Sequence, residues 1–595
     1  MEPDVAGNRP TPPFHTLEGA SRLLAQHGLL RLREAGDSPR TPVSRLRKLA
    51  AVERSDLLTI VVYGVAIGVA SLLVPVAVQS LVNTVAFTPL VQPLVVLSLV
   101  VFIGMLSASA LKVLQYRVVE TLQQRFFVRV VYSAAQALRR ADLERAFREH
   151  GPRDLMNRFF DTFIVQKAAA TLLMDGLSVL LQGGVSLVLL AFYHPALLAF
   201  DVVLIGLILF IVFGLGRRAV ETAIKESKAK HATAEWLEEM AGALRTFKSP
   251  DGFLFGLRRS DALAKSYVAY RKKHFSILLR QVVAAYVLQG LATASLLGLG
   301  GYLVIRGQLS LGQLVAAELI VTAVLSNVAK MGKYFESYYD LVASLDKLGS
   351  IFDVPLEPES ESTLLPRAVR SELNTDGLSF EFDRKPVLRG VSFQVSAGSC
   401  VAVLGAEASG KSTLVDLLYG LRRPSSGKVV LDGVDLRGIS VDEVRERISV
   451  VGRAEVFEGT IEDNLHLGHP AIDARRVEEL LTVVGLSEEV ASMRDGIRSS
   501  VGPSGSRLTS SQRARLSIAR ALARDTGILI IDEALDAVGP HLFASILRNI
   551  RSAFPDLGVL LTTSRSEIAA YADRVVRLED EQPRTDFSNE EMVGA

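Results

Sequence analysis

Hydrophobic residues are concentrated in the first 350 residues of the chain, where long apolar runs alternate with charged segments. Each run is close to the ~20 residues that a helix needs to cross the hydrocarbon core of a bilayer. The six runs are Leu57–Leu81, Leu94–Leu114, Ala169–Phe192, Leu197–Leu215, Ile277–Val304 and Leu314–Val328. The last is short, so we expect its helix to extend by a turn or more. A buried helical core is the alternative, but six such runs favour six membrane spans.

Positive charge lies on one side of the predicted spans. Arg40, Arg45, Arg47, Lys48 and Arg54 precede the first span, whereas residues 83–93, between the first two spans, carry no charge. Lysine and arginine are enriched in cytoplasmic loops, so both termini and the soluble part that follows the spans are expected in the cytoplasm. The first 30 residues have no long apolar stretch, and thus no cleaved signal peptide is expected. Residues 16–33 have weak amphipathic spacing and are interpreted either as a surface helix or as a solvated tail.

Two of the ionisable residues near the spans allow different interpretations. Asp201 follows an external loop by a few residues, so we expect it at the membrane interface, with a cavity position as the alternative. Asp175 lies near a predicted cytoplasmic end, where we expect an interfacial polar network. Charged side chains inside lipid are costly, about 2.5–3.5 kcal/mol each, and therefore usually face a partner or a cavity.

The last third of the chain has the pattern of a soluble α/β domain and contains a phosphate-binding motif. Residues 405–412, Gly-Ala-Glu-Ala-Ser-Gly-Lys-Ser, fit G-x-x-x-x-G-K-[ST] between an apolar strand, residues 399–404, and a helix. In this context the backbone N–H groups and the helix N-terminus favour phosphate, Lys411 reaches the outer phosphates, and Ser412 can ligate Mg²⁺. A glycine-rich turn with a chance lysine fits this context poorly. The predicted nucleotide-binding residues here are Gly405, Ser409, Gly410, Lys411, Ser412 and Thr413.

A second segment completes the predicted nucleotide pocket. Gly527–Ile531 is an apolar strand that ends in Asp532 and Glu533. An aspartate at such a strand end can hold Mg²⁺ through water, and the adjacent Glu533 is placed to polarise an attacking water, as the catalytic carboxylate. A solvated acidic pair is the alternative, but the phosphate loop argues against it.

Length and charge limit the architecture and the partners. A chain of 595 residues is too long for one hydrophobic core. The net charge of +2 gives no signature of nucleic-acid binding, and the single cysteine, Cys400, is interpreted as a core residue. We expect an N-terminal cytosolic segment (1–55), a transmembrane domain (56–350), a linker (351–370), a nucleotide-binding domain (371–582) and a C-terminal tail (583–595).

With both halves considered, the chain resembles an ABC exporter half-transporter. The segments that carry the resemblance are residues 151–161, 239–248, 307–315, 386–393 and 457–461, together with the phosphate loop. The resemblance implies an all-α polytopic domain of six helices with long cytoplasmic extensions, followed by an α/β P-loop nucleotide-binding domain for ATP and Mg²⁺. It also implies a dimer, a homodimer or a heterodimer, in which each ATP lies between one phosphate loop and the other chain's signature segment.

Several positions depart from the family pattern. The signature LSGGQ stands here as Leu508-Thr-Ser-Ser-Gln512, so Thr509, Ser510, Ser511 and Gln512 are the expected ATP contacts. The Q-loop glutamine aligns with Gly452, the D-loop aspartate with Gly539, and the switch histidine with Ser564, which still offers a hydroxyl to phosphate. The aromatic that stacks on adenine aligns with Phe382, for which a core position is the alternative. The binding half of the pocket is therefore expected to be whole and the switching half weakened.

Two functions are compatible with this pattern. Intact Lys411, Asp532 and Glu533 favour ATP-driven export, from a bacterial inner membrane, of an unidentified peptide, protein, lipid or drug. The alternative, an ATP-binding regulatory or scaffold subunit with little turnover, is favoured by Gly452, Gly539, Ser564, Ser510 and Ser511. A resemblance to bacterial toxin-secretion ABC proteins favours a periplasmic adaptor as a further partner, beside membrane lipid. A nucleic-acid partner is not expected, since soluble ABC ATPases of that class lack spans.

Overall fold

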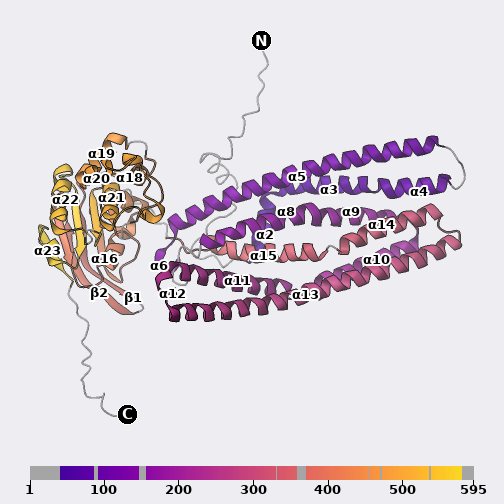
Figure 1. Ribbon diagram of the computed structural model, residues 1–595, viewed down its shortest axis with the longest axis horizontal. Coiled ribbons are helices and arrows are strands. Elements are labelled where there is room, and N and C mark those ends of the chain that lie inside the picture. Colours follow the sequence, from indigo (N-terminus) through magenta and orange to yellow (C-terminus); the bar gives the residue numbers. More distant parts are fainter. Residues whose placement is uncertain are drawn as a thin grey trace, which may run out of the picture. The chain divides into compact units, whose positions relative to one another are not determined.

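The computed structural model describes residues 41–85, 91–146, 156–329, 331–357, 370–382, 384–452, 455–469, 472–534, 536 and 538–578. The chain divides into two compact units, Met1–Glu357 and Pro358–Ala595. The first is helical and the second contains both sheets and helices (Figure 1). Most of the predicted linker, the predicted tail and the amphipathic stretch at residues 16–33 lie outside the described residues.

All six predicted spans lie in long apolar helical segments of the first unit. These segments are Arg54–Thr84, Gln92–Arg140, Arg158–Tyr193, Pro195–Leu215, Pro250–Ile305 and Leu311–Phe352. The short sixth run does extend as expected, since its helix begins at Leu311. The chain is therefore an integral membrane protein.

Two helices are far longer than a bilayer requires. α5 has 49 residues and α13 has 56, which corresponds to roughly 70–85 Å at 1.5 Å per residue. Each helix combines an apolar span with a charged extension that lies beside neighbouring helices (Figure 1). The span is the first part of α5 and the last part of α13. The helices of this unit are α2 (Pro42–Val52), α3 (Arg54–Ser71), α4 (Leu73–Val85), α5 (Gln92–Arg140), α6 (Leu143–Ala146), η1 (Arg158–Phe160), α8 (Asp161–Thr171), η2 (Leu172–Gly176), α9 (Leu177–Tyr193), α10 (Pro195–Leu209), η3 (Phe210–Leu215), α11 (Ala219–Gly242), α12 (Leu244–Phe247), α13 (Pro250–Ile305), α14 (Leu311–Ala329) and α15 (Met331–Phe352).

Polar contacts between side chains join the helical extensions. The Arg271 guanidinium of α13 lies 3.1 Å from Glu226 of α11 and 3.4 Å from Glu336 of α15. The indole N–H of Trp236 donates to the Ser260 hydroxyl at 3.0 Å and so ties α11 to α13. Such side-chain bridges fix the register of the long helices against one another.

The structure shows which way Asp201 points. The residue is only 3% exposed and lies on the same face of α10 as the buried Leu197 and Leu204. Its side chain therefore points into the helix bundle. Asp175 does belong to a polar network, because its carboxylate lies 3.0 Å from the ammonium of Lys333.

The second unit contains two sheets. One is antiparallel in the order β2-β1-β4-β5, and the other is parallel in the order β6-β7-β8-β3-β9. The strands are β1 (Leu373–Phe382), β2 (Lys385–Val395), β3 (Cys400–Leu404), β4 (Ser426–Leu431), β5 (Val434–Asp435), β6 (Ile448–Val451), β7 (Ile528–Asp532), β8 (Gly558–Thr563) and β9 (Arg574–Arg577). The helices are α16 (Lys411–Leu418), η4 (Leu436–Gly438), α17 (Val441–Arg447), α18 (Ile461–His466), α19 (Ala474–Val483), α20 (Ser487–Ala491), η5 (Gly496–Arg498), η6 (Pro503–Gly505), α21 (Ser510–Leu522), α22 (Pro540–Ala553) and α23 (Ser566–Ala569).

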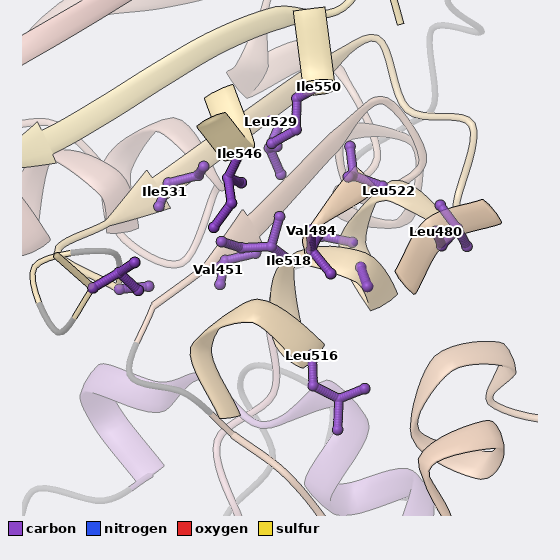
Figure 2. Packing of buried hydrophobic residues seen from close by; sticks show 14 of the residues in the cluster. Val451, Leu480, Val484, Leu516, Ile518, Leu522, Leu529, Ile531, Ile546 and Ile550 are labelled. Atoms are coloured by element: carbon purple, nitrogen blue, oxygen red, sulfur yellow. The ribbon is translucent and has the colours of Figure 1, made fainter. Parts of the chain in front are cut away.

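Apolar side chains cover both faces of the parallel sheet. Leu529 and Ile531 of β7 pack with Ile546 and Ile550 of α22 on one face (Figure 2). Ile528 and Ile530 of the same strand belong to the core on the other face. Continuous apolar strands are typical of parallel sheets that are buried on both sides. Because β3, β7 and β8 run parallel, their carboxyl ends meet at one edge of the sheet.

Candidate nucleotide-binding site

The predicted phosphate loop joins β3 to α16, as the motif requires. Gly410 has φ of 91°, and an added Cβ would lie 2.9 Å from a Leu388 methyl carbon and 3.0 Å from the Val387 carbonyl oxygen. A Cβ on Gly405 would lie 2.3 Å from the Ser409 hydroxyl oxygen. Only glycine fits this backbone at both positions without movement, so these glycines set the shape of the loop.

Lys411 lies inside this loop. Its side chain is 4% exposed, and its ammonium donates to the carbonyl oxygens of Gly405 at 2.8 Å and Ala406 at 2.6 Å. The same ammonium lies 3.1 Å from a carboxylate oxygen of Glu533. The predicted phosphate-binding lysine and the predicted catalytic carboxylate are thus brought into direct contact.

The carboxyl ends of β7 and β8 contribute the acidic part of the site. Asp532 is the last residue of β7, and its carboxylate accepts a hydrogen bond of 2.5 Å from the Thr562 hydroxyl. Glu533 follows with φ of 53°, and its side chain is 42% exposed. Both carboxylates therefore lie at the end of the strand, where the sequence predicts them.

Thr562, Thr563 and Asp536 also belong to this site, although no motif in the sequence pointed to them. The Thr563 hydroxyl donates to the Asp536 carboxylate at 2.9 Å. Burial raises the pKa of Asp536 above its usual range, while the hydrogen bond from Thr563 opposes the shift. The available signal was the pair of adjacent threonines at the end of an apolar strand, where polar side chains are unusual.

These residues fit a Mg²⁺-bound nucleoside triphosphate. Within the described part of the chain, the buried Ser409 hydroxyl has no hydrogen-bond partner, which is the state expected of a group that meets a ligand. Ser412 is exposed in the first turn of α16, and Thr413 follows it. The loop N–H groups, Lys411 and the helix N-terminus supply the positive field for phosphates. Ser412 and Asp532 supply oxygen ligands of the kind that Mg²⁺ prefers.

The signature segment begins a helix. Thr509 caps α21: its hydroxyl accepts from the Gln512 N–H at 3.2 Å, and its own N–H donates to the Gln512 side chain at 2.9 Å. The helix runs from Ser510 to Leu522. Ser510 and Ser511 therefore present the free N–H groups of the first turn.

The remaining predicted residues lie on open surface or at strand ends. Ser564 is exposed directly after β8, and an added Cβ on Gly452 or Gly539 would meet nothing within 4 Å. Phe382 ends β1 and is 43% exposed, with the Arg422 guanidinium 6.0 Å from its ring centroid. This exposure disagrees with the core alternative for Phe382 and leaves the ring free to stack.

Comparisons with known proteins address both units. The family model described as ABC transporter transmembrane region matches residues 57–328. The family model described as ABC transporter matches residues 388–536, which include the phosphate loop and Asp532. Together the two models account for the spans and for most of the nucleotide-binding unit.

Curated relatives share about half of the chain. The alpha-hemolysin translocation ATP-binding protein HlyB of Escherichia coli O157:H7 is 27% identical over 50% of this chain and 42% of its own length. The leukotoxin export ATP-binding protein LtxB of Aggregatibacter actinomycetemcomitans is 29% identical over 47% of this chain and 40% of its own. The mycobactin import ATP-binding/permease protein IrtB of Mycolicibacterium smegmatis is 29% identical over 49% of this chain and 50% of its own length. The matches thus span half or less of these relatives.

A solved structure extends the comparison to the fold of most of the chain. The structure of a bacterial Atm1-family ABC exporter with ATP bound superposes with a TM-score of 0.77 at 19% identity, and covers 89% of this chain and 94% of that one. The two units of this protein therefore have the fold of an exporter half. The chain belongs to the ABC transporters, and it carries the transmembrane region and the nucleotide-binding domain of that family in one polypeptide.

Proposed function

We propose that the protein is one half of a dimeric transporter that uses ATP to export an unidentified substrate. The observation that carries this proposal is the contact of Lys411 with Glu533 at the strand ends, in a chain that also has six apolar spans. A phosphate-binding lysine beside a carboxylate that can orient water supports hydrolysis, and the spans supply a route for the substrate.

The residues of the site have separate roles in this proposal. The loop from Gly405 to Gly410 and the Lys411 ammonium bind and neutralise the phosphates. Ser412 and Asp532 would hold Mg²⁺, which would supply positive charge to stabilise the phosphates. Glu533 orients the attacking water and receives its proton. The exposed Phe382 ring stacks on the base.

A second half-transporter completes each site. The free N–H groups at the start of α21, at Ser510 and Ser511, can bind the phosphates held by the other chain's loop. ATP then bridges two domains, and its hydrolysis removes the bridge and shifts the equilibrium between closed and open dimers. Homodimers and heterodimers both satisfy this geometry.

Turnover is proposed to be slow. Gly452 and Gly539 offer no side chain to the pocket, and Ser564 can donate a hydrogen bond but cannot carry positive charge. Loss of groups that position water and sense the γ-phosphate costs about 10²-fold or more in rate. These same positions support the second candidate, an ATP-binding regulatory or scaffold subunit.

Location, direction and partners also belong to the proposal. The charge asymmetry between loops supports cytoplasmic termini and a cytoplasmic nucleotide-binding domain in a bacterial inner membrane. The names of two relatives, a translocation protein and an export protein for bacterial toxins, support export. A periplasmic adaptor is a further partner in this proposal. The name of a third describes import, so direction requires its own measurement.

The proposal is tested by ATP hydrolysis in lipid vesicles. Purified wild-type protein and the Glu533→Gln variant are reconstituted under identical conditions, and phosphate release is measured with and without Mg²⁺. We expect slow, Mg²⁺-dependent hydrolysis that falls at least about 100-fold in the variant. Equal release by the two proteins would reject the role of Glu533 and favour the regulatory subunit.

A further inference from the structure

The end of strand β8 lies between the two segments that carry the nucleotide-binding residues. Thr562 is paired with Asp532 of β7 on one side and with Val403 of β3 on the other. Thr563 is paired with Leu404, the residue before the phosphate loop, and its carbonyl oxygen accepts from the Gly405 N–H at 3.3 Å. Both threonines are almost completely buried, at 2% and 1% exposure.

The two threonine hydroxyls bind carboxylates at opposite ends of one turn. The Thr562 hydroxyl donates to Asp532, and the Thr563 hydroxyl donates to Asp536. Neighbouring residues in a strand point to opposite faces of the sheet. The adjacent pair can therefore hold the turn from both sides.

Glu533 stands inside this turn in an unusual conformation. Its φ of 53° is in the left-handed region, which residues with a Cβ rarely adopt. Its N–H donates to the Thr562 carbonyl oxygen at 3.1 Å, and its own carbonyl oxygen accepts from the Asp536 N–H at 3.1 Å. A strained residue of this kind persists only when the surrounding contacts over-determine it.

A further contact continues the network beyond the turn. The Arg565 N–H donates to the Thr563 hydroxyl oxygen at 3.0 Å, and its guanidinium donates to the Asp536 carbonyl oxygen at 3.3 Å. The Thr563 hydroxyl therefore accepts a hydrogen bond from Arg565 and donates one to Asp536. This arrangement connects Asp536 to the segment that carries Ser564, the switch position.

We propose that Thr562 and Thr563 are positioning residues, whose hydroxyl groups clamp the two ends of the turn and hold Glu533 where its carboxylate can act on water. The inference rests on the proposed role of Glu533 in hydrolysis. The hydrogen bond of a buried threonine hydroxyl can also serve only to stabilise the core. The test must therefore separate positioning from packing.

Valine replaces threonine without a change of shape and removes the hydroxyl. We therefore compare Thr562→Val, Thr563→Val and the corresponding serine variants in the reconstituted full-length protein. Thr375→Val is the matched control, since Thr375 is 6% exposed and its hydroxyl is also hydrogen bonded, to Phe393 of the antiparallel sheet. Each protein is assayed for the single-turnover rate, the KM for ATP, and Mg²⁺-dependent binding of a fluorescent ATP analogue.

We expect each valine variant at positions 562 and 563 to lose about tenfold or more in rate, while KM and analogue affinity stay within about threefold. The serine variants, which retain the hydroxyl, should recover most of the rate. The control should keep the wild-type rate. A rate loss in the control equal to that at 562 and 563 would assign the effect to packing and overturn the inference.

Combination with Glu533→Gln provides the second measurement. If the threonines act through Glu533, adding Thr562→Val or Thr563→Val to Glu533→Gln should lower the residual rate by less than twofold, because positioning matters only while the carboxylate is present. A full additional loss would overturn the inference. If Glu533→Gln alone has no effect, the proposed role of Glu533 fails, which is a distinct outcome. Alanine variants carry the same test where a valine variant does not fold.

Discussion

The ammonium of Lys411 and the carboxylate of Glu533 form an ion pair of 3.1 Å at the centre of the nucleotide-binding site. Lys411 and Glu533 are 122 positions apart in the sequence. They meet because β3 and β7 belong to one parallel sheet, with β8 between them. We expect a bound triphosphate to replace Glu533 as the neighbour of the lysine, and binding would then release the carboxylate toward water.

Substitution of this carboxylate by an amide should separate binding from hydrolysis. Glu533→Gln removes the competing negative charge beside Lys411, so we expect ATP affinity to rise about threefold to tenfold while hydrolysis falls at least about 100-fold. Equilibrium titration and phosphate release measure the two effects. Glu478→Gln, on the exposed side of α19, is the matched control and should change neither. Weaker ATP binding by Glu533→Gln would contradict a competing ion pair.

Removal of the lysine should abolish tight binding. Lys411→Ala takes away the buried positive charge inside the loop, and we expect ATP affinity to fall at least about 100-fold, or about 2.7 kcal/mol. Lys428→Ala removes an exposed lysine of β4 and serves as the control with unchanged affinity. Both are measured by titration of the purified protein. Unchanged affinity in Lys411→Ala would reject the assignment of the phosphate loop.

Local patterns were sufficient for the membrane spans and for the phosphate loop. Both depend on residues that are close in sequence: about twenty apolar residues in a row, or glycines and a lysine at fixed offsets between a strand and a helix. The helix start at Ser510 was also readable, because Thr509 and Gln512 form the T-x-x-Q pattern of a capping box. The prediction of Thr509 and Gln512 as ATP contacts alone does not include this capping role.

Contacts between distant segments could not be predicted in the same way. The Thr562–Asp532 and Thr563–Asp536 hydrogen bonds depend on the order and register of parallel strands, and a one-residue change of register would move every side chain to the other face. The burial of Asp201 likewise depends on how α10 is rotated within the bundle. The sequence position of Asp201 alone gives only the depth of this residue along the helix.

Restoring the missing polar groups should accelerate hydrolysis. Gly452→Gln enters open space, and Ser564→His returns a side chain that can carry positive charge near the γ-phosphate. Ser510→Gly with Ser511→Gly permits closer approach of the signature backbone. We expect the combined variant to be at least about tenfold faster, a change of about 1.4 kcal/mol in the barrier.

The control for this variant is Gly438→Gln, since an added Cβ at Gly438 also meets nothing within 4 Å. It should leave turnover unchanged. The four substitutions act in one shared pocket, so their separate effects are not expected to add. A combined variant that forms dimers but hydrolyses ATP at the wild-type rate would favour the regulatory subunit.

Accessibility of single cysteines tests the proposed topology. In a Cys400→Ala background, Gln308→Cys and Lys230→Cys place exposed thiols on opposite sides of the predicted membrane. In intact cells, a membrane-impermeant maleimide should label position 308 and not position 230, because the positive loops face the cytoplasm. Permeabilised cells provide the control, in which both positions should react. The opposite labelling pattern would reverse the topology.

The native cysteine should remain unreactive until the second unit unfolds. Cys400 is 0% exposed at the start of β3. Burial, with a smaller effect of the Asp573 carboxylate, raises the pKa of its thiol to about 12. The thiolate is the nucleophile, so both access and ionisation oppose reaction with maleimide.

We therefore expect Cys400 in the purified wild-type protein to react at least about 100-fold more slowly than an exposed thiol, introduced as Lys428→Cys, and to reach the same rate in denaturant.

The raised pKa also has a consequence for stability. The folded unit retains the thiol proton to higher pH than the unfolded chain does, so this group's contribution to stability is lost as pH rises from about 9 to about 12. The labelling rate of Cys400 should therefore rise more steeply with pH than the ionisation of an exposed thiol would predict. Equal rates at the two positions near pH 8 would contradict the burial of Cys400 between β8 and β9.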